Sequence, residues 1–113
     1  LGGASAAIFA DNNPTRIDAI AFWDSYPPDS ADLSDSTISA LSIFGTTDGV
    51  PNTDNFDDKR HLLPAKTEFV GIEGASHAQF GDYGPQKGDV VASMSLAEQH
   101  ELVAEIMLDF INP

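Results

Sequence analysis

Three short apolar runs constrain the fold of this chain more than any other feature. They occupy residues 17–23, 40–44 and 67–73, and a glycine ends the second and the third of them. Runs this short and this apolar are typical of strands buried on both faces of a parallel sheet. Such strands need helices on both sides. We therefore expect a parallel sheet inside an α/β architecture.

The segments between and around these runs supply the expected helices. Residues 4–10 are strong helix formers, and Pro14 follows them. Ser95 and Glu98 have the spacing of a capping box, which predicts that the last helix begins there. Its apolar face is predicted from residues that recur at three- and four-residue intervals, namely Leu102, Val103, Ile106, Met107, Phe110 and Ile111.

Two connections complete the predicted order. Residues 24–39 are rich in Pro, Asp and Ser and predict a long loop, whereas residues 52–63 are compatible with a short helix before Pro64. The order is helix, strand, loop, strand, short helix, strand, long loop, helix. Strands that alternate with helices predict a three-layer α/β/α fold with right-handed crossovers.

Composition excludes several classes of function. Acidic residues outnumber basic ones 18 to 5, which gives a formal net charge of −13 and argues against binding to nucleic acids or to anionic membranes. The chain has no cysteine, and its three histidines do not have the spacing of zinc ligands, so we expect no metal and no thiol chemistry. No apolar run is long enough to span a membrane, and no signal segment opens the chain, which favours a cytoplasmic location.

Candidate chemistry lies where the three runs end. Asp24 follows the first run, Asp48 the second and His77 the third. In open α/β sheets the reactive groups gather beyond the carboxyl ends of the strands, so an acid and a histidine from neighbouring strands can meet there. A carboxylate that orients a histidine base is two thirds of a catalytic triad. A nucleophile is missing from this set, because neither Ser5 nor Ser76 is suitably placed.

The start of the chain suggests where that nucleophile belongs. Leu1-Gly2-Gly3-Ala4-Ser5 resembles the nucleophile elbow of the α/β-hydrolase superfamily from the residue just after its serine. The sequence Ile72-Glu73-Gly74-Ala75-Ser76-His77 resembles the context of the family's histidine, and the order serine, acid, histidine also fits. The resemblance is to small serine hydrolases near the dienelactone-hydrolase and esterase branches, and it covers the C-terminal half of their fold.

The resemblance implies a role for individual residues. Asp48 matches the triad acid, His77 the general base, and Leu1 the donor of a backbone amide to the oxyanion hole. Asp24 is the alternative acid, because some α/β hydrolases carry theirs after the preceding strand. Residues expected to line the substrate pocket lie in the loop at 24–39 and in the segment at 79–83, with Asp24, Tyr26, Gln79 and Phe80 as the candidates.

The predicted function is therefore that of a serine hydrolase that cleaves a carboxylic ester, a lactone or a related acyl compound without a cofactor. Its serine would precede Leu1, so the 113-residue chain alone should be inactive. The strand that begins at Ile17 and ends at Trp23 would then be a bare edge, which predicts pairing with the N-terminal half of the same hydrolase or self-association. The alternative is a non-catalytic α/β fragment with an interaction role.

Overall fold

A computed structural model of the chain describes residues 2–46 and 59–112. The strands and helices follow the predicted order closely. They are α1 (Gly2–Asn12), β1 (Ala19–Trp23), β2 (Ser39–Gly45), the short 3-10 helix η1 (Arg60–Leu62), β3 (Glu68–Ile72), the 3-10 helix η2 (Ala78–Phe80) and α3 (Leu96–Ile111). The three apolar runs all form strands, as predicted.

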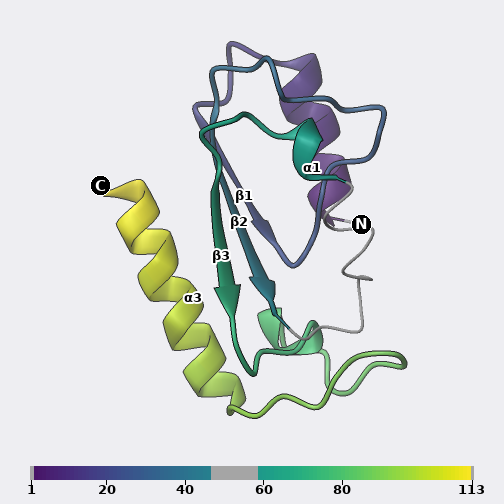
Figure 1. The fold of residues 1–113 in the computed structure, drawn as a ribbon, viewed down its shortest axis with the longest axis vertical. Helices are drawn as coiled ribbons and strands as arrows, with labels where there is room; N and C mark the ends of the chain where they lie inside the picture. Colours follow the sequence, from purple (N-terminus) through teal and green to yellow (C-terminus); the bar gives the residue numbers. More distant parts are fainter. Residues whose placement is uncertain (1, 47–58, 113) are drawn as a thin grey trace.

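The strands form one parallel sheet in the order β1-β2-β3. Helix α1 covers one face of this sheet and α3 covers the other (Figure 1). Because successive side chains of a strand point to opposite faces, each helix packs on its own cluster: Phe22 lies with Ala7 under α1, and Ile43 lies with Val103 under α3. The three-layer α/β/α architecture predicted from the sequence is confirmed.

Burial on both faces holds fully only for the central strand. In β2, Leu41 and Ile43 are fully buried and Ser42 is 1% exposed, whereas both ends of β1 are exposed. The prediction that all three strands are buried on both faces was therefore too broad. The difference arises because β1 and β3 are the outer strands of the described sheet and have a neighbour on one side only.

The last helix begins as the sequence predicts. The Ser95 hydroxyl accepts a hydrogen bond from the Glu98 amide at 3.1 Å, and the Glu98 carboxylate accepts one from the Ser95 amide at 3.4 Å. The predicted apolar face was too wide, because Leu102 and Ile111 are 38% and 63% exposed. The sheet covers only the strip of α3 that contains Val103 and its partly buried neighbours Ile106, Met107 and Phe110.

The connection between β1 and β2 contains no helix or strand, as predicted, yet it is firmly attached. Ala31 and Leu33 are buried in it, and the Leu33 amide donates to the Leu62 carbonyl at 2.7 Å. The Lys59 Nζ also donates a hydrogen bond to the Asp29 Oδ1 at 2.6 Å, and this hydrogen bond lowers the pKa of the Asp29 carboxyl. Of the short helix predicted at 52–63, the described residues contain only η1.

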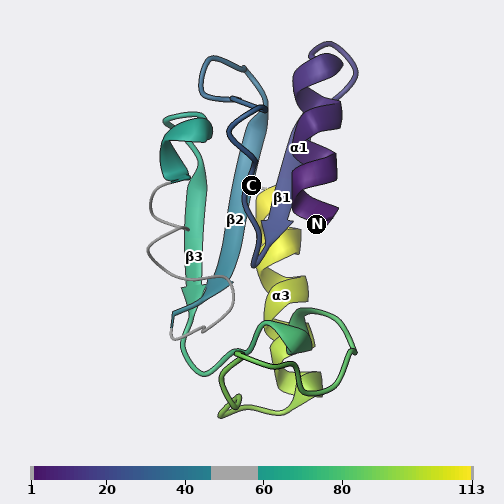
Figure 2. The ribbon, with the colours of Figure 1, turned by 90° about the vertical axis from the view of Figure 1, so that its right-hand side faces the viewer.

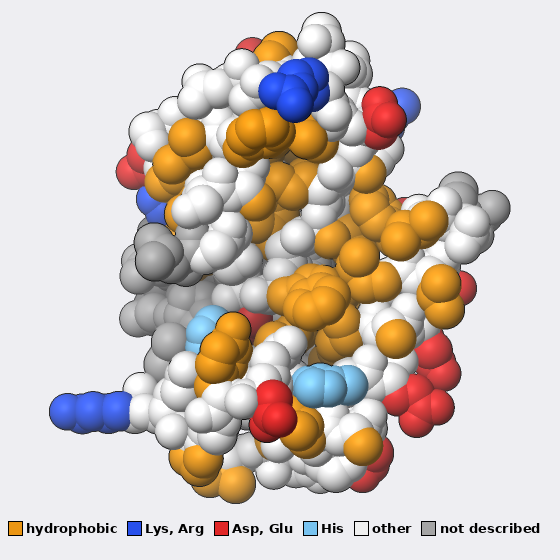
Figure 3. All heavy atoms as spheres, turned by 180° about the vertical axis from the view of Figure 1, so that it is seen from behind, with side chains coloured by type: hydrophobic (Ala, Val, Ile, Leu, Met, Phe, Trp, Pro, Cys, Tyr) orange, Lys and Arg blue, Asp and Glu red, His pale blue; other side chains and the backbone are white. Residues whose placement is uncertain are grey.

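The outer edge of β1 is uncovered in the described structure. Hydrophobic side chains spread across the middle of this side of the molecule (Figure 3). Trp23, at the end of β1, is 44% exposed, and its indole nitrogen lies 3.4 Å from the Met107 sulfur. Within residues 2–46 and 59–112, no helix has the length and apolar character of a membrane span.

Gly3 allows the start of α1 to approach the end of β1. A Cβ at this position would lie 2.2 Å from the Ser25 Oγ and 2.6 Å from its Cβ, whereas a Cβ at Gly2 would meet no atom within 4 Å. Gly3→Ala is expected to lower the free energy of unfolding by about 1–3 kcal/mol, because overpacking must push the helix away. Gly2→Ala is the matched control and should leave the free energy of unfolding unchanged or slightly higher. Urea unfolding of both variants tests this, and equal midpoints would contradict it.

Candidate active site

The candidate site lies at the end of the sheet toward which all three strands run. The carboxyl ends of the parallel strands share one edge, and η2 lies just beyond it (Figure 2). The loops after β1 and β3 contribute Asp24 and His77 to this edge. This is the place where α/β sheets commonly carry their reactive groups.

Asp24 is held in an unusual backbone conformation. It follows the last residue of β1 with a φ of 50°, a left-handed value that residues other than glycine seldom adopt. Its amide still donates to the Ile43 carbonyl of β2 at 2.7 Å, so the chain turns sharply without leaving the sheet. The residue is 2% exposed. Strain of this kind is concentrated at functional sites, and here it directs a carboxylate into the end of the sheet.

The Asp24 carboxylate binds the imidazole of His77. Its Oδ2 lies 2.5 Å from the His77 Nδ1, and its Oδ1 accepts the Gly45 amide at 3.4 Å. A carboxylate at Nδ1 keeps a proton on that nitrogen and leaves the lone pair of a neutral imidazole on Nε2. His77 is thereby arranged as a proton acceptor, and its side chain is 32% exposed.

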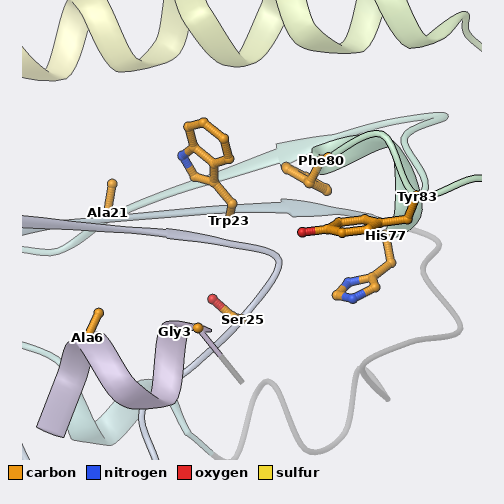
Figure 4. Close-up of a pocket in the computed structure, with 10 residues that line it drawn as sticks. Gly3, Ala6, Ala21, Trp23, Ser25, His77, Phe80 and Tyr83 are labelled. Atoms are coloured by element: carbon orange, nitrogen blue, oxygen red, sulfur yellow. The ribbon is translucent and has the colours of Figure 1, made fainter.

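A cavity of about 330 Å³ opens beside His77. It lies between the start of α1, the end of β1 and the turn around η2, and the ring of Tyr83 extends over the imidazole (Figure 4). Its walls combine small residues, two hydroxyl groups and several rings, namely Gly2, Gly3, Ala6, Ala21, Trp23, Ser25, Phe80, Gly81 and Tyr83. The cavity offers a small molecule both rings and hydroxyl groups next to the base.

A family model described as an alpha/beta hydrolase family matches residues 1–101. The chain belongs to this family. No curated protein and no solved structure matches it. Membership of the alpha/beta hydrolases supports a hydrolase-type function and agrees with the observed fold.

The predicted site residues of this alpha/beta hydrolase lie in different places. His77 and Phe80 line the cavity, and Asp24 lies behind His77 at its Nδ1. Tyr26 lies instead beside a very small space with Lys59 and Arg60. Leu1 and Asp48, the predicted oxyanion donor and triad acid, lie outside the described residues.

Gln79 turns away from the cavity toward α3. Its side-chain amide donates to the Met94 carbonyl at 3.2 Å and to the Gln99 Oε1 at 3.1 Å. Its observed contacts are therefore with the packing behind the turn. Sequence reasoning missed Trp23 as a lining residue, although its position at the end of a strand is the signal that singles out Asp24, whereas Ser25 lies in the loop at 24–39 that was expected to line the pocket.

Metal binding has no support in the part of the chain that the structure describes. No group of three or more His, Cys, Asp or Glu side chains there is arranged to hold an ion. The contact between the His77 Nδ1 and the Asp24 carboxylate is an arrangement that supports proton transfer at His77, with the carboxylate orienting the ring.

Proposed function

We propose that this chain carries the base and the orienting acid of a serine hydrolase that cleaves a carboxylic ester or a lactone. The observation that carries the proposal is the imidazole of His77, which binds a buried carboxylate at Nδ1 and borders a cavity lined by both polar and apolar groups. Membership of the alpha/beta hydrolase family gives the reaction class. The cavity volume of about 330 Å³ suits a small acyl substrate.

The nucleophile in this proposal is a serine that directly precedes Leu1. Two features support that position: the resemblance of residues 1–5 to a nucleophile elbow, and the cavity that the first residues of α1 share with His77. The uncovered edge of β1 beside this cavity would accept the strand that leads to such an elbow. The amide of Leu1 would then face the oxyanion.

The reaction follows from these positions. The serine oxygen attacks the ester carbonyl while His77 Nε2 takes its proton, and the imidazolium returns that proton to the leaving alcohol. The acyl-enzyme is then hydrolysed by a water that His77 deprotonates, which restores the serine. The carboxylate at Nδ1 orients the ring and stabilises the imidazolium in both halves. The described residues offer Asp24 for this role, and the family resemblance offers Asp48.

Labelling with a fluorophosphonate, which reacts with activated serines, tests this assignment. In a protein that carries residues 1–113 and the segment before Leu1, mass spectrometry should find the adduct on the serine next to Leu1. The isolated 113-residue chain should take up no label and should not hydrolyse p-nitrophenyl acetate. An adduct on a serine within the chain, such as Ser25, would overturn the position of the nucleophile. A longer protein with neither labelling nor turnover would support the non-catalytic module instead.

A further inference from the structure

One carboxylate near His77 has no part in the proton transfer described above. Asp89 lies in the long connection between η2 and α3 and is half-buried. Its Oδ1 accepts the His77 amide at 3.0 Å and its Oδ2 accepts the Ala78 amide at 2.9 Å. Oδ1 also accepts the Val90 amide at 2.9 Å. The carboxylate thus binds the backbone of the histidine twelve residues earlier in the chain.

These hydrogen bonds occur where the backbone of His77 would otherwise lack partners. His77 directly precedes η2 and its own side chain does not cap that end, while the Ser76 hydroxyl accepts only the Gln79 amide at 3.3 Å. The first amides of a helical turn have no carbonyl partner within it, so they need an acceptor from outside. Asp89 supplies both oxygens of a charged acceptor, and charge-assisted hydrogen bonds are the stronger kind.

A second side chain, from α3, holds the residue before His77. Gln99 of α3 is fully buried, accepts the Ser76 amide at 3.1 Å and donates to the Ser76 carbonyl at 2.9 Å. The turn that carries the imidazole is therefore held by side chains from two different segments of the chain. Gln99 belongs to the packed interior, whereas Asp89 comes from a connection in which residues 82–88 are all exposed. Removing Asp89 should consequently disturb the turn and spare the core.

Asp89 does not line the cavity beside His77, so it would not touch a substrate there. It borders a separate space behind the turn, together with Asp82 and Gln79. We propose that Asp89 is a positioning residue, which sets the placement of the His77 imidazole by holding its backbone. This inference rests on the proposed function, because it needs His77 to be the base.

Substitution of Asp89 is expected to lower kcat rather than to raise KM. A displacement of about 1 Å in a catalytic group can cost about 100-fold in rate. Asp89→Ala loses all three hydrogen bonds and should lower kcat for p-nitrophenyl acetate about 100-fold with KM within about twofold. Asp89→Asn keeps one accepting oxygen but presents an NH₂ group to a backbone amide, so its kcat should fall by about 10-fold. The graded order of the two variants distinguishes positioning from general destabilisation.

The control is Glu101→Ala, which removes the same charge from an exposed position of α3 that lines neither cavity. It should leave kcat unchanged. Amide hydrogen exchange provides a readout independent of activity: His77 and Ala78 should exchange faster in Asp89→Ala, while residues of β2 keep their rates. If Asp89→Ala does not fold, Asp89→Asn carries the test by the same two measurements.

Each outcome separates this inference from the function on which it rests. Full activity of both Asp89 variants, with His77→Ala inactive, would overturn the positioning role and leave the proposed function standing. An active His77→Ala variant would overturn the proposed function itself. Equal losses in Asp89→Ala and Glu101→Ala would also overturn the positioning role, because they would trace the effect to charge.

Discussion

Replacing His77 by alanine is expected to lower kcat for ester hydrolysis about 10⁶-fold in a protein that carries the proposed serine. A serine hydroxyl is a weak nucleophile until a neighbouring base takes its proton, and His77 is the histidine that borders the cavity. The loss should appear almost wholly in kcat, because the walls that bind the acyl group remain. Initial rates over a range of p-nitrophenyl acetate concentrations measure both parameters.

His61→Ala is the matched control for this variant. His61 lies in η1, is exposed and does not line the cavity, so its removal should leave kcat within about twofold. Circular dichroism should show that both variants remain folded. A His77→Ala protein that keeps more than about a tenth of the activity would contradict the role of His77 as the base.

The sequence was sufficient to predict the strands and the two long helices. The runs at 17–23, 40–44 and 67–73 are apolar because each strand contributes to a core beneath a helix, so the pattern reports directly on burial. The capping box at Ser95 is equally local, since both of its hydrogen bonds join residues three apart. Local patterns of this kind can be predicted because they depend only on residues close together in the sequence.

The exposure of the outermost apolar side chains of α3 could not be predicted in the same way. Leu102 and Ile111 continue the apolar spacing of α3, yet they are exposed because the sheet is too narrow to cover them. The width of a sheet depends on how many strands pair, and the pattern within one helix does not contain that number. The apolar stripe therefore predicted the helix correctly but overestimated the width of its buried face.

The candidate site was predicted in its position but only partly in its contacts. His77 was identified because it follows a strand, and the same rule drew attention to Asp24. The pairing of these two residues depends on the φ of 50° at Asp24, which no sequence pattern encodes. The contact of Asp89 with the His77 backbone spans a connection of irregular structure, so no periodicity indicates it.

Removing the carboxylate that orients His77 is expected to lower kcat about 10⁴-fold, because an amide at Nδ1 favours the wrong tautomer of the imidazole. Two residues are candidates for this carboxylate, and they are tested separately as Asp24→Asn and Asp48→Asn. The distance of 2.5 Å between the Asp24 Oδ2 and the His77 Nδ1 predicts that Asp24→Asn is the variant that loses kcat. The family resemblance predicts that it follows Asp48→Asn.

The two variants serve as controls for each other, because each removes one negative charge from a segment that follows an apolar run in the sequence. A loss confined to Asp24→Asn assigns the acid to the loop after β1. A loss confined to Asp48→Asn assigns it to the loop after β2, and His77 would then exchange its partner when the site becomes active. Small losses in both single variants and in the double variant would contradict a carboxylate-oriented base altogether. The magnitude decides the matter, since a surface ion pair contributes only about 0–1 kcal/mol and cannot produce a 10⁴-fold effect.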